Sequence, residues 1–325
     1  MLNKNDVKGL YTMMCTPAKH SATSWDATDV VNLDEAARAT EEFIKAGIGG
    51  FSLCGTTGEC GCLLWEEKQK FIATVCEVNK HRVPVFAGAT TLGTRDTIRQ
   101  MRGLKAVGAD GAFNGLPLWQ TPSYLNSTDY FKDLGEAVPD MGIMVYANMR
   151  FFKMKFLADW WQLLVSKANT VVTAKISYST DHLEDDVKFA GHKIKFVPST
   201  GPALDCYKRV GPDNITAAWS TTASCGPEPL VAFANALVAK DLPKMEAINN
   251  DLKQIVSHIP ENDRPGFDIY NSQSNKYVTN LCKWMDGGPL LRPYHDLPDA
   301  WKKQAELSAQ THEPIRKKYM KVGAH

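Results

Sequence analysis

Eight short, mostly apolar stretches recur along the chain, and longer segments of helix-like composition separate them. The composition and length of the apolar stretches are typical of buried β-strands. We expect strands at residues 10–15, 49–54, 83–88, 111–116, 142–147, 171–176, 194–198 and 215–219. We expect helices between them near residues 33–46, 65–80, 94–107, 127–138 and 157–167.

A helical or helix-length segment follows each predicted strand, and this βα repeat indicates a parallel sheet. Eight repeats favour a closed (β/α)8 TIM barrel in residues 1–240, close to the roughly 250 residues typical of this α/β fold. An open parallel sheet is the alternative, although no Gly-x-Gly-x-x-Gly fingerprint follows the first strand. Residues 241–325 are expected to form a C-terminal helical extension that packs on the barrel.

The overall composition is that of an ordinary globular protein, with 44% hydrophobic and 22% charged residues among 325. Lys and Arg number 37 against 36 Asp and Glu. This balance argues against a nucleic-acid partner or a polybasic membrane patch. No apolar run reaches the length of a membrane span. The N-terminal residues lack the apolar core of a secretory signal, so we expect a cytoplasmic protein with reduced cysteines.

Three of the eight cysteines lie close together in the sequence, at Cys54, Cys60 and Cys62. A metal site is one interpretation of this cluster. The cluster contains no C-x-x-C pair and has no histidine at ligand spacing, so we expect no metal.

The carboxyl ends of the strands are where the active site of a TIM barrel is built. Lys175 lies near the end of the sixth predicted strand, inside an apolar run. A buried ammonium is costly, and a lysine held as a neutral amine is a nucleophile toward carbonyl groups. The alternative is a lysine that reaches the barrel rim or pairs with a carboxylate.

The turn after the second predicted strand reads Gly55-Thr56-Thr57-Gly58 and precedes a predicted helix. Its backbone N–H groups could bind the carboxylate of a substrate. A plain turn, with a threonine capping the helix, is the other interpretation.

The ends of three further strands carry candidate residues. Tyr146 and Asn148 share one side of the fifth strand, and a phenol beside an amine can carry protons while an amide can orient water. Tyr146 could equally be a tyrosine whose hydroxyl group bonds to the backbone, and Asn148 could be a residue that begins a turn. Trp219, at the end of the eighth strand, and Trp119, after the fourth, could form the wall of an aromatic pocket or ordinary packing under a loop.

These strand ends together resemble the dihydrodipicolinate synthase / N-acetylneuraminate lyase superfamily. The motifs are Gly55-Thr56-Thr57-Gly58-Glu59, Tyr146, and Lys175 at 29 positions beyond Tyr146. The resemblance implies a (β/α)8 Schiff-base aldolase of pyruvate with a C-terminal helical extension.

Within the superfamily the chain is most similar to the trans-o-hydroxybenzylidenepyruvate and trans-2'-carboxybenzalpyruvate hydratase-aldolases of aromatic-hydrocarbon breakdown. The matching motifs are Tyr146-Ala147-Asn148, Val172-Thr173-Ala174-Lys175, Ala218-Trp219-Ser220, Cys225-Gly226-Pro227, Tyr270-Asn271 and Gly288-Pro289. Dihydrodipicolinate synthases have Tyr-Asn-x-Pro after the fifth strand, a following arginine that binds the second substrate, and a relay tyrosine after the fourth strand. Met149, Arg150 and Leu118-Trp119 do not match these features, so lysine biosynthesis is not expected.

The resemblance implies that the enzyme hydrates and cleaves an ortho-substituted trans-benzylidenepyruvate, an aryl-substituted 2-keto acid, to an aromatic aldehyde and pyruvate. Lys175 would form the Schiff base, so that no cofactor is needed, and Tyr146 would shuttle protons. Asn148, with Asn271 as the weaker candidate, would orient the attacking water. The resemblance also implies a homotetramer.

The remaining implied contacts concern the substrate. Gly55, Thr56 and Thr57 would bind the pyruvyl carboxylate, and Trp219 and Trp119 would line the aryl pocket. Arg150 or Lys153 could meet an ortho carboxylate, which we favour slightly over an ortho hydroxyl. The alternatives are a 2-keto-3-deoxy sugar-acid aldolase or dehydratase of the same superfamily, and a non-catalytic keto-acid-binding barrel.

Overall fold

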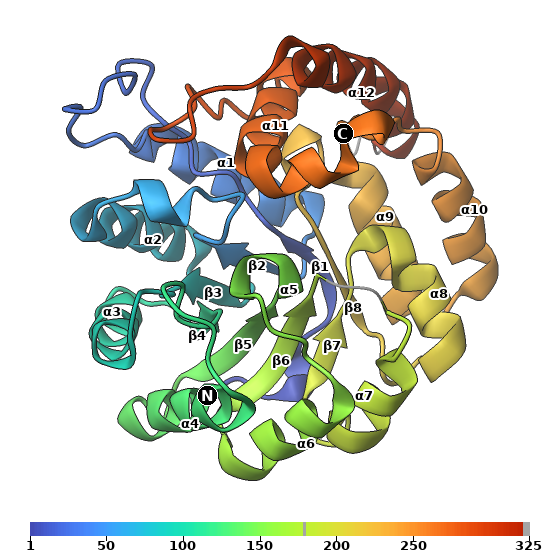
Figure 1. Ribbon diagram of the computed structural model, residues 1–325. Helices are drawn as coiled ribbons and strands as arrows, with labels where there is room; N and C mark the ends of the chain where they lie inside the picture. Colours follow the sequence, from blue (N-terminus) through green and yellow to red (C-terminus); the bar gives the residue numbers. More distant parts are fainter. Residues whose placement is uncertain (178–179, 321–325) are drawn as a thin grey trace.

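A computed structural model describes residues 1–177 and 180–320 as a ring of helices around a central cylinder of parallel strands (Figure 1). The strands are β1 (Gly9–Thr12), β2 (Gly50–Leu53), β3 (Val85–Gly88), β4 (Gly111–Asn114), β5 (Gly142–Ala147), β6 (Val171–Ile176), β7 (Lys195–Val197) and β8 (Ala217–Ser220). Neighbouring strands pair in the order β7-β6-β5-β4-β3-β2-β1-β8. Trp219 N–H donates to the Pro198 carbonyl at 2.9 Å and joins the two ends of the sheet. The predicted TIM barrel is confirmed.

Helices cover the outside of the barrel. They are α1 (Leu33–Ala46), α2 (Trp65–Asn79), α3 (Thr94–Ala106), α4 (Tyr124–Ala137), α6 (Ala158–Lys167), α7 (Leu183–Ala190), α8 (Thr200–Val210) and α9 (Glu228–Val238), whereas the short helix α5 (Met149–Phe152) lies over the strand ends. Local sequence sets their ends: the Asn32 side chain accepts from Glu35 N–H at the start of α1, and Gly47, in the left-handed region, ends it. The helix α5 was not expected, and it immediately follows β5 at the site described below.

Several strands are shorter than their apolar stretches. The predicted third strand began at Val83, whereas β3 begins at Val85 after Pro84, which has no N–H to donate. The predicted second strand ended at Cys54, whereas β2 ends at Leu53 because Cys54 adopts a left-handed conformation with φ 52°. The chain therefore leaves the barrel wall one residue early and enters the Gly55–Glu59 turn.

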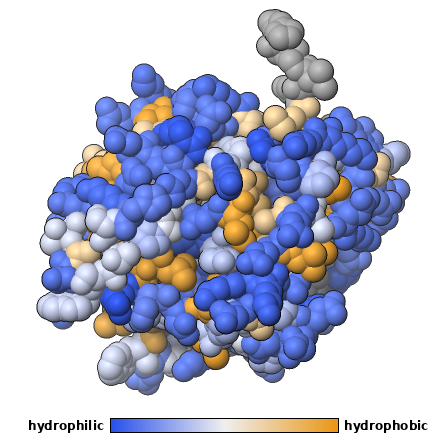
Figure 2. All heavy atoms as spheres, turned by 90° about the horizontal axis from the view of Figure 1, so that it is seen from above, coloured by the Kyte–Doolittle hydropathy of each residue, from blue (hydrophilic) through white to orange (hydrophobic). Residues whose placement is uncertain are grey.

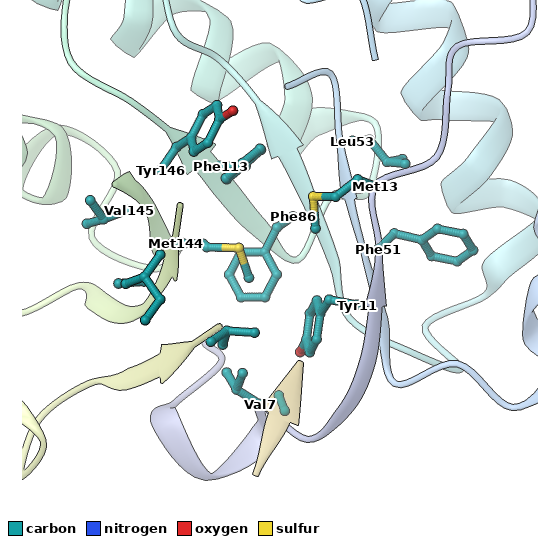
Figure 3. Close-up of a cluster of buried hydrophobic side chains, with 14 of the residues drawn as sticks. Val7, Tyr11, Met13, Phe51, Leu53, Phe86, Phe113, Met144, Val145 and Tyr146 are labelled. Carbon is teal, nitrogen blue, oxygen red and sulfur yellow. The ribbon is translucent and has the colours of Figure 1, made fainter. Parts of the chain in front are cut away.

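Large side chains fill the barrel interior (Figure 3). Tyr11 and Phe86 lie with ring centres 6.0 Å apart, beside Met144. Gly111 makes room for this layer, because a Cβ there would lie 2.5 Å from the Phe86 ring. Tyr146 lies at one end of the cluster, and its hydroxyl group points away from Phe86 and Met144. Tyr146 thus packs against the filled barrel interior at the end of the cluster.

The C-terminal extension consists of α10 (Leu242–Leu252), η4 (Glu261–Gly266), α11 (Phe267–Cys282) and α12 (Asp299–Tyr319). The helix α10 packs on α8 and α9, and α12 packs on α9 and α11. The helix α11 also contacts η3 (Thr222–Cys225), the short helix directly after β8. Residues 321–325 of the predicted extension lie outside the described part of the chain. These contacts bring α11 to the carboxyl end of the barrel.

Small hydrophobic patches are scattered over a largely hydrophilic face in Figure 2. No helix in residues 1–177 and 180–320 has the length and apolar character needed to cross a bilayer.

Candidate active site

Lys175 lies near the carboxyl end of β6 and is only 4% exposed. Its Nζ donates to Ser177 Oγ at 2.8 Å and forms no ion pair with any carboxylate in the described residues. Burial lowers the pKa of Lys175 well below its ordinary value. Burial therefore favours the neutral amine, which is the form that attacks a carbonyl carbon.

Two aromatic rings enclose this amine. Lys175 Nζ lies 3.6 Å from the ring centre of Trp219 and 4.3 Å from that of Tyr146. The Trp219 indole is fixed because its Nε1–H donates to the Ile176 carbonyl at 3.0 Å. Tyr146 faces Lys175 directly in the register of β5 and β6. The two rings exclude water from the amine, which accounts for its low pKa.

The hydroxyl group of Tyr146 belongs to a short polar chain. It lies 3.2 Å from Thr56 Oγ1 and accepts a hydrogen bond of 3.2 Å from Asn148 Nδ2. Burial raises the pKa of Tyr146, so the hydroxyl keeps its proton at neutral pH. Tyr146 is therefore equipped to donate and accept protons beside the amine.

Asn148 caps the short helix α5. Its Oδ1 accepts from Arg150 N–H at 3.0 Å and from Phe151 N–H at 3.3 Å, while its Nδ2 binds Tyr146. Both ends of the amide are therefore engaged, and the side chain holds the phenol and the start of α5 in fixed positions.

The Gly55–Glu59 turn faces the same space. Gly55 is required there, because a Cβ would lie 2.8 Å from the Phe113 ring. The backbone N–H groups of Thr56 and Thr57 have no acceptor in the described part of the chain. A small cavity of about 10 Å³ is lined by both threonines, Tyr146 and Lys175. The turn can thus present free N–H donors to an anion beside the amine.

A buried ion pair fixes this turn to the extension. Glu59, the last residue of the turn, pairs with Lys276 of α11, and both side chains are fully buried. The other carboxylate oxygen accepts from Leu291 N–H at 3.0 Å, and Thr16 Oγ1 donates to the Gly58 carbonyl at 2.7 Å. The sequence interpretation missed this pair, whose members are 217 positions apart.

Replacing Lys276 with methionine should destabilise the fold by about 3 kcal/mol, because the Glu59 carboxylate would remain buried without its cation. Urea unfolding measures the change. Lys303→Met on α12 is the matched control: Lys303 is exposed and has no ion pair in the described residues, so its change should stay within about 0.5 kcal/mol. Equal stability of the two variants would contradict this account of the pair.

A cavity of about 510 Å³ joins these groups at the carboxyl end of the barrel. Lys175, Tyr146, Asn148, Thr57 and Trp219 line one part of it. Residues 257–271 of the extension line another part, through Ser257, Ile259, Arg264, Phe267, Asp268 and Asn271. A second cavity, of about 320 Å³, is also lined by Tyr146, together with Gly55, Thr56 and Asn271. The extension thus completes the site that the strands begin.

Asn271 lines both cavities from α11. Its Oδ1 and its carbonyl accept from Asn275 Nδ2, at 3.3 and 2.8 Å. Its own Nδ2 has no acceptor among the described residues. Asn271 therefore offers the cavities a free amide donor, whereas both ends of the Asn148 amide are already engaged in hydrogen bonds.

Arg150 and Lys153 differ in position. Arg150 lines the large cavity, but its Nη1 pairs with Asp268 at 3.0 Å, and both side chains are about half exposed. Lys153 is exposed and lines neither cavity. The charge of Arg150 is thus already matched by a carboxylate.

Trp119, like Lys153, is a predicted site residue that the structure does not bring to the others. Its side chain is 86% exposed and lines neither cavity, although the adjacent Leu118 lines the smaller one. Loop residues have no strand alternation to fix their direction, so the direction of the Trp119 side chain could not be predicted from the sequence.

Cys54, Cys60 and Cys62 are all free cysteines. No group of three or more His, Cys, Asp or Glu side chains that could hold a metal occurs in residues 1–177 and 180–320. Lys68 Nζ donates to Cys60 Sγ at 3.3 Å, and burial raises the pKa values of Cys54 and Cys62 to about 12. These thiols remain protonated at neutral pH.

Curated proteins similar to the chain over its full length are hydratase-aldolases. Trans-O-hydroxybenzylidenepyruvate hydratase-aldolase of Pseudomonas putida is 36% identical, over 98% of this chain and 97% of its own length. Trans-2'-carboxybenzalpyruvate hydratase-aldolase of Nocardioides sp. (strain KP7) is 31% identical, over 97% and 96% respectively. The predictions of an enzyme and of a lyase are confirmed by these relatives.

Solved structures also resemble the chain over nearly its full length. The structure described as PhdJ bound to substrate intermediate superposes with a TM-score of 0.93 at 30% identity, over 98% of this chain and 99% of that one. A catalytic lysine mutant of Ruminococcus gnavus sialic acid aldolase has a TM-score of 0.79 at 15% identity, which shows a shared fold, over 98% and 100%. A sequence model of the dihydrodipicolinate synthetase family matches residues 8–267. The chain belongs to the dihydrodipicolinate synthetase family.

Proposed function

We propose that this enzyme is a class I hydratase-aldolase that converts an ortho-substituted trans-benzylidenepyruvate to an aromatic aldehyde and pyruvate. The observation that carries the proposal is the buried amine of Lys175, which shares a cavity with Tyr146 and the Thr56–Thr57 turn. The full-length similarity to hydratase-aldolases supports the choice of substrate class.

The first step is formation of a Schiff base. The turn at Thr56 and Thr57 binds the carboxylate of the keto acid through backbone N–H groups and hydroxyls. The neutral Lys175 amine attacks the 2-keto carbon, and the keto oxygen leaves as water with protons carried by Tyr146. The product is a protonated imine conjugated with the carbon–carbon double bond.

Hydration and cleavage follow. The conjugated iminium makes the benzylic carbon electrophilic, so water adds there and a proton is added to the neighbouring carbon. Removal of the new hydroxyl proton then breaks the bond between these carbons, releases the aldehyde and leaves an enamine on Lys175. Protonation and hydrolysis of the enamine release pyruvate. The iminium accepts the electrons, so we propose that no cofactor takes part.

We assign the two asparagines different tasks. Asn148 binds Tyr146 and caps α5, so it positions the phenol. Asn271 faces the cavities with a free amide donor, so it orients the attacking water and then the hydroxyl group. This division reverses the order of preference drawn from the sequence.

We place the aryl ring in the larger cavity, beside Trp219, Ile259 and Phe267. Curated relatives with a hydroxyl or a carboxyl ortho substituent both match over nearly the full length. We also propose a homotetramer, whose interfaces would give the exposed Trp119 and Leu118 an apolar environment.

Pyruvate release from a panel of substrates tests the proposal. The panel comprises 2'-carboxy-, 2'-hydroxy- and unsubstituted benzylidenepyruvate, together with 2-keto-3-deoxy sugar acids, and lactate dehydrogenase coupling measures the pyruvate. We expect turnover of benzylidenepyruvates and little or none of the sugar acids, because apolar and aromatic side chains line much of the cavity. Preference for the sugar acids would refute the proposed function.

A further inference from the structure

We infer that Arg264 is the specificity-determining residue that binds the ortho carboxylate of the substrate ring. The inference deepens the proposed function and rests on it. Arg264 lies in η4, on the part of the large cavity that the extension supplies, and lines the same cavity as Lys175.

Arg264 carries an unmatched charge. Its guanidinium forms no ion pair in residues 1–177 and 180–320. The nearest acidic residue in the sequence, Asp263, is engaged elsewhere: its Oδ2 accepts from the Trp301 indole at 2.9 Å and its Oδ1 from Gly266 N–H at 3.2 Å. Asp268, the acidic residue that lines the cavity with Arg264, is paired with Arg150. One guanidinium is therefore left to receive an anion.

The short helix η4 gives Arg264 a fixed base. Trp301 of α12 is buried, and its bond to Asp263 anchors the segment to the extension. Phe267 N–H donates to the Arg264 carbonyl at the start of α11. Arg264 is an exposed residue that lines the cavity, and two neighbouring helices hold its backbone.

The charge distribution of a 2'-carboxy substrate fits this arrangement. Its trans double bond holds the keto-acid carboxylate apart from the ring carboxylate, so each needs its own anion site. The free N–H groups of Thr56 and Thr57 serve the first, and Arg264 serves the second through the paired N–H donors that suit a carboxylate. A 2'-hydroxy or unsubstituted ring leaves Arg264 without an anionic partner.

Substitution of Arg264 should therefore change selectivity and leave the chemical steps intact. In Arg264→Gln, kcat/KM should fall about tenfold or more for 2'-carboxybenzylidenepyruvate and change less than about twofold for the unsubstituted compound. Arg264→Lys should recover part of the loss, because it keeps the charge without the paired donors. Lys153→Gln is the control: this exposed cation lies outside the cavity, so selectivity should not change.

Different outcomes refute different claims. Equal losses on all three benzylidenepyruvates in Arg264→Gln, or no loss on any, would overturn the role of Arg264 and leave the proposed function standing. Absence of pyruvate release from every benzylidenepyruvate by the unmodified enzyme would overturn the proposed function itself. A selective loss on the carboxy compound supports both.

Discussion

Replacement of Lys175 with methionine is expected to lower pyruvate release from a benzylidenepyruvate by a factor on the order of 10⁴ or more. Methionine keeps much of the side-chain volume between Trp219 and Tyr146 but has no amine to form the imine. Steady-state assays with coupled detection of pyruvate measure the loss. Residual activity within about tenfold of the unmodified enzyme would refute nucleophilic catalysis by this residue.

Borohydride trapping gives the same prediction a chemical readout. Pyruvate condenses with the amine, its keto oxygen leaves as water, and borohydride reduces the imine to a stable secondary amine. Peptide mass analysis should find this adduct on the Lys175 peptide. Lys195→Met is the matched control. Lys195 lies in the neighbouring strand β7 and pairs with Thr173, two positions before Lys175. Trapping on Lys175 should persist in this variant. An adduct on another lysine would move the proposed site.

Replacement of Tyr146 with phenylalanine is expected to lower kcat about 10³-fold and to leave KM little changed. Phenylalanine preserves the ring contact with Phe113, whose centre is 4.8 Å away, and removes only the hydroxyl bound by Thr56 and Asn148. The loss should therefore fall on proton transfer and not on binding. Steady-state kinetics separate kcat from KM, and single-turnover kinetics separate chemistry from product release.

A second buried tyrosine supplies the control for this change. Tyr130 donates its hydroxyl hydrogen to Thr97 Oγ1 at 3.2 Å, on the outer helices and outside both cavities. Tyr130→Phe removes one buried hydroxyl in the same way, so it should leave kcat unchanged. If both tyrosine variants lost activity equally, the effect of Tyr146 would be structural.

Strand-level features were predictable from the sequence because they depend on local pattern. Alternation along a strand put Tyr146 and Asn148 on one side, and the eight βα repeats made β5 and β6 neighbours, so the approach of Tyr146 to Lys175 followed. Ser177, the hydrogen-bond partner of the amine, could have been found by the same alternation, two positions beyond Lys175.

Contributions from the extension were not predictable, because no local pattern encodes them. The Glu59–Lys276 pair and the position of Arg264 depend on how α11 and η4 pack over the strand ends. The capping role of Asn148 depends on α5, which is only four residues long and has no periodicity to detect. The sequence predicted which strand ends lie together, whereas tertiary packing determines the contacts that support them and the part of the cavity that the extension lines.

The buried amine of Lys175 also implies that the native state loses stability in order to keep its nucleophile. In the unfolded chain this lysine titrates near its ordinary pKa of 10.5, and in the folded chain well below it. Between the two values the unfolded state binds a proton that the folded state lacks, so stability rises with pH across this window. The penalty is absent above 10.5, grows as the pH falls, and is complete below the folded pKa. Lys175, the proposed nucleophile, is thus a residue whose removal should make the fold more resistant to unfolding at neutral pH.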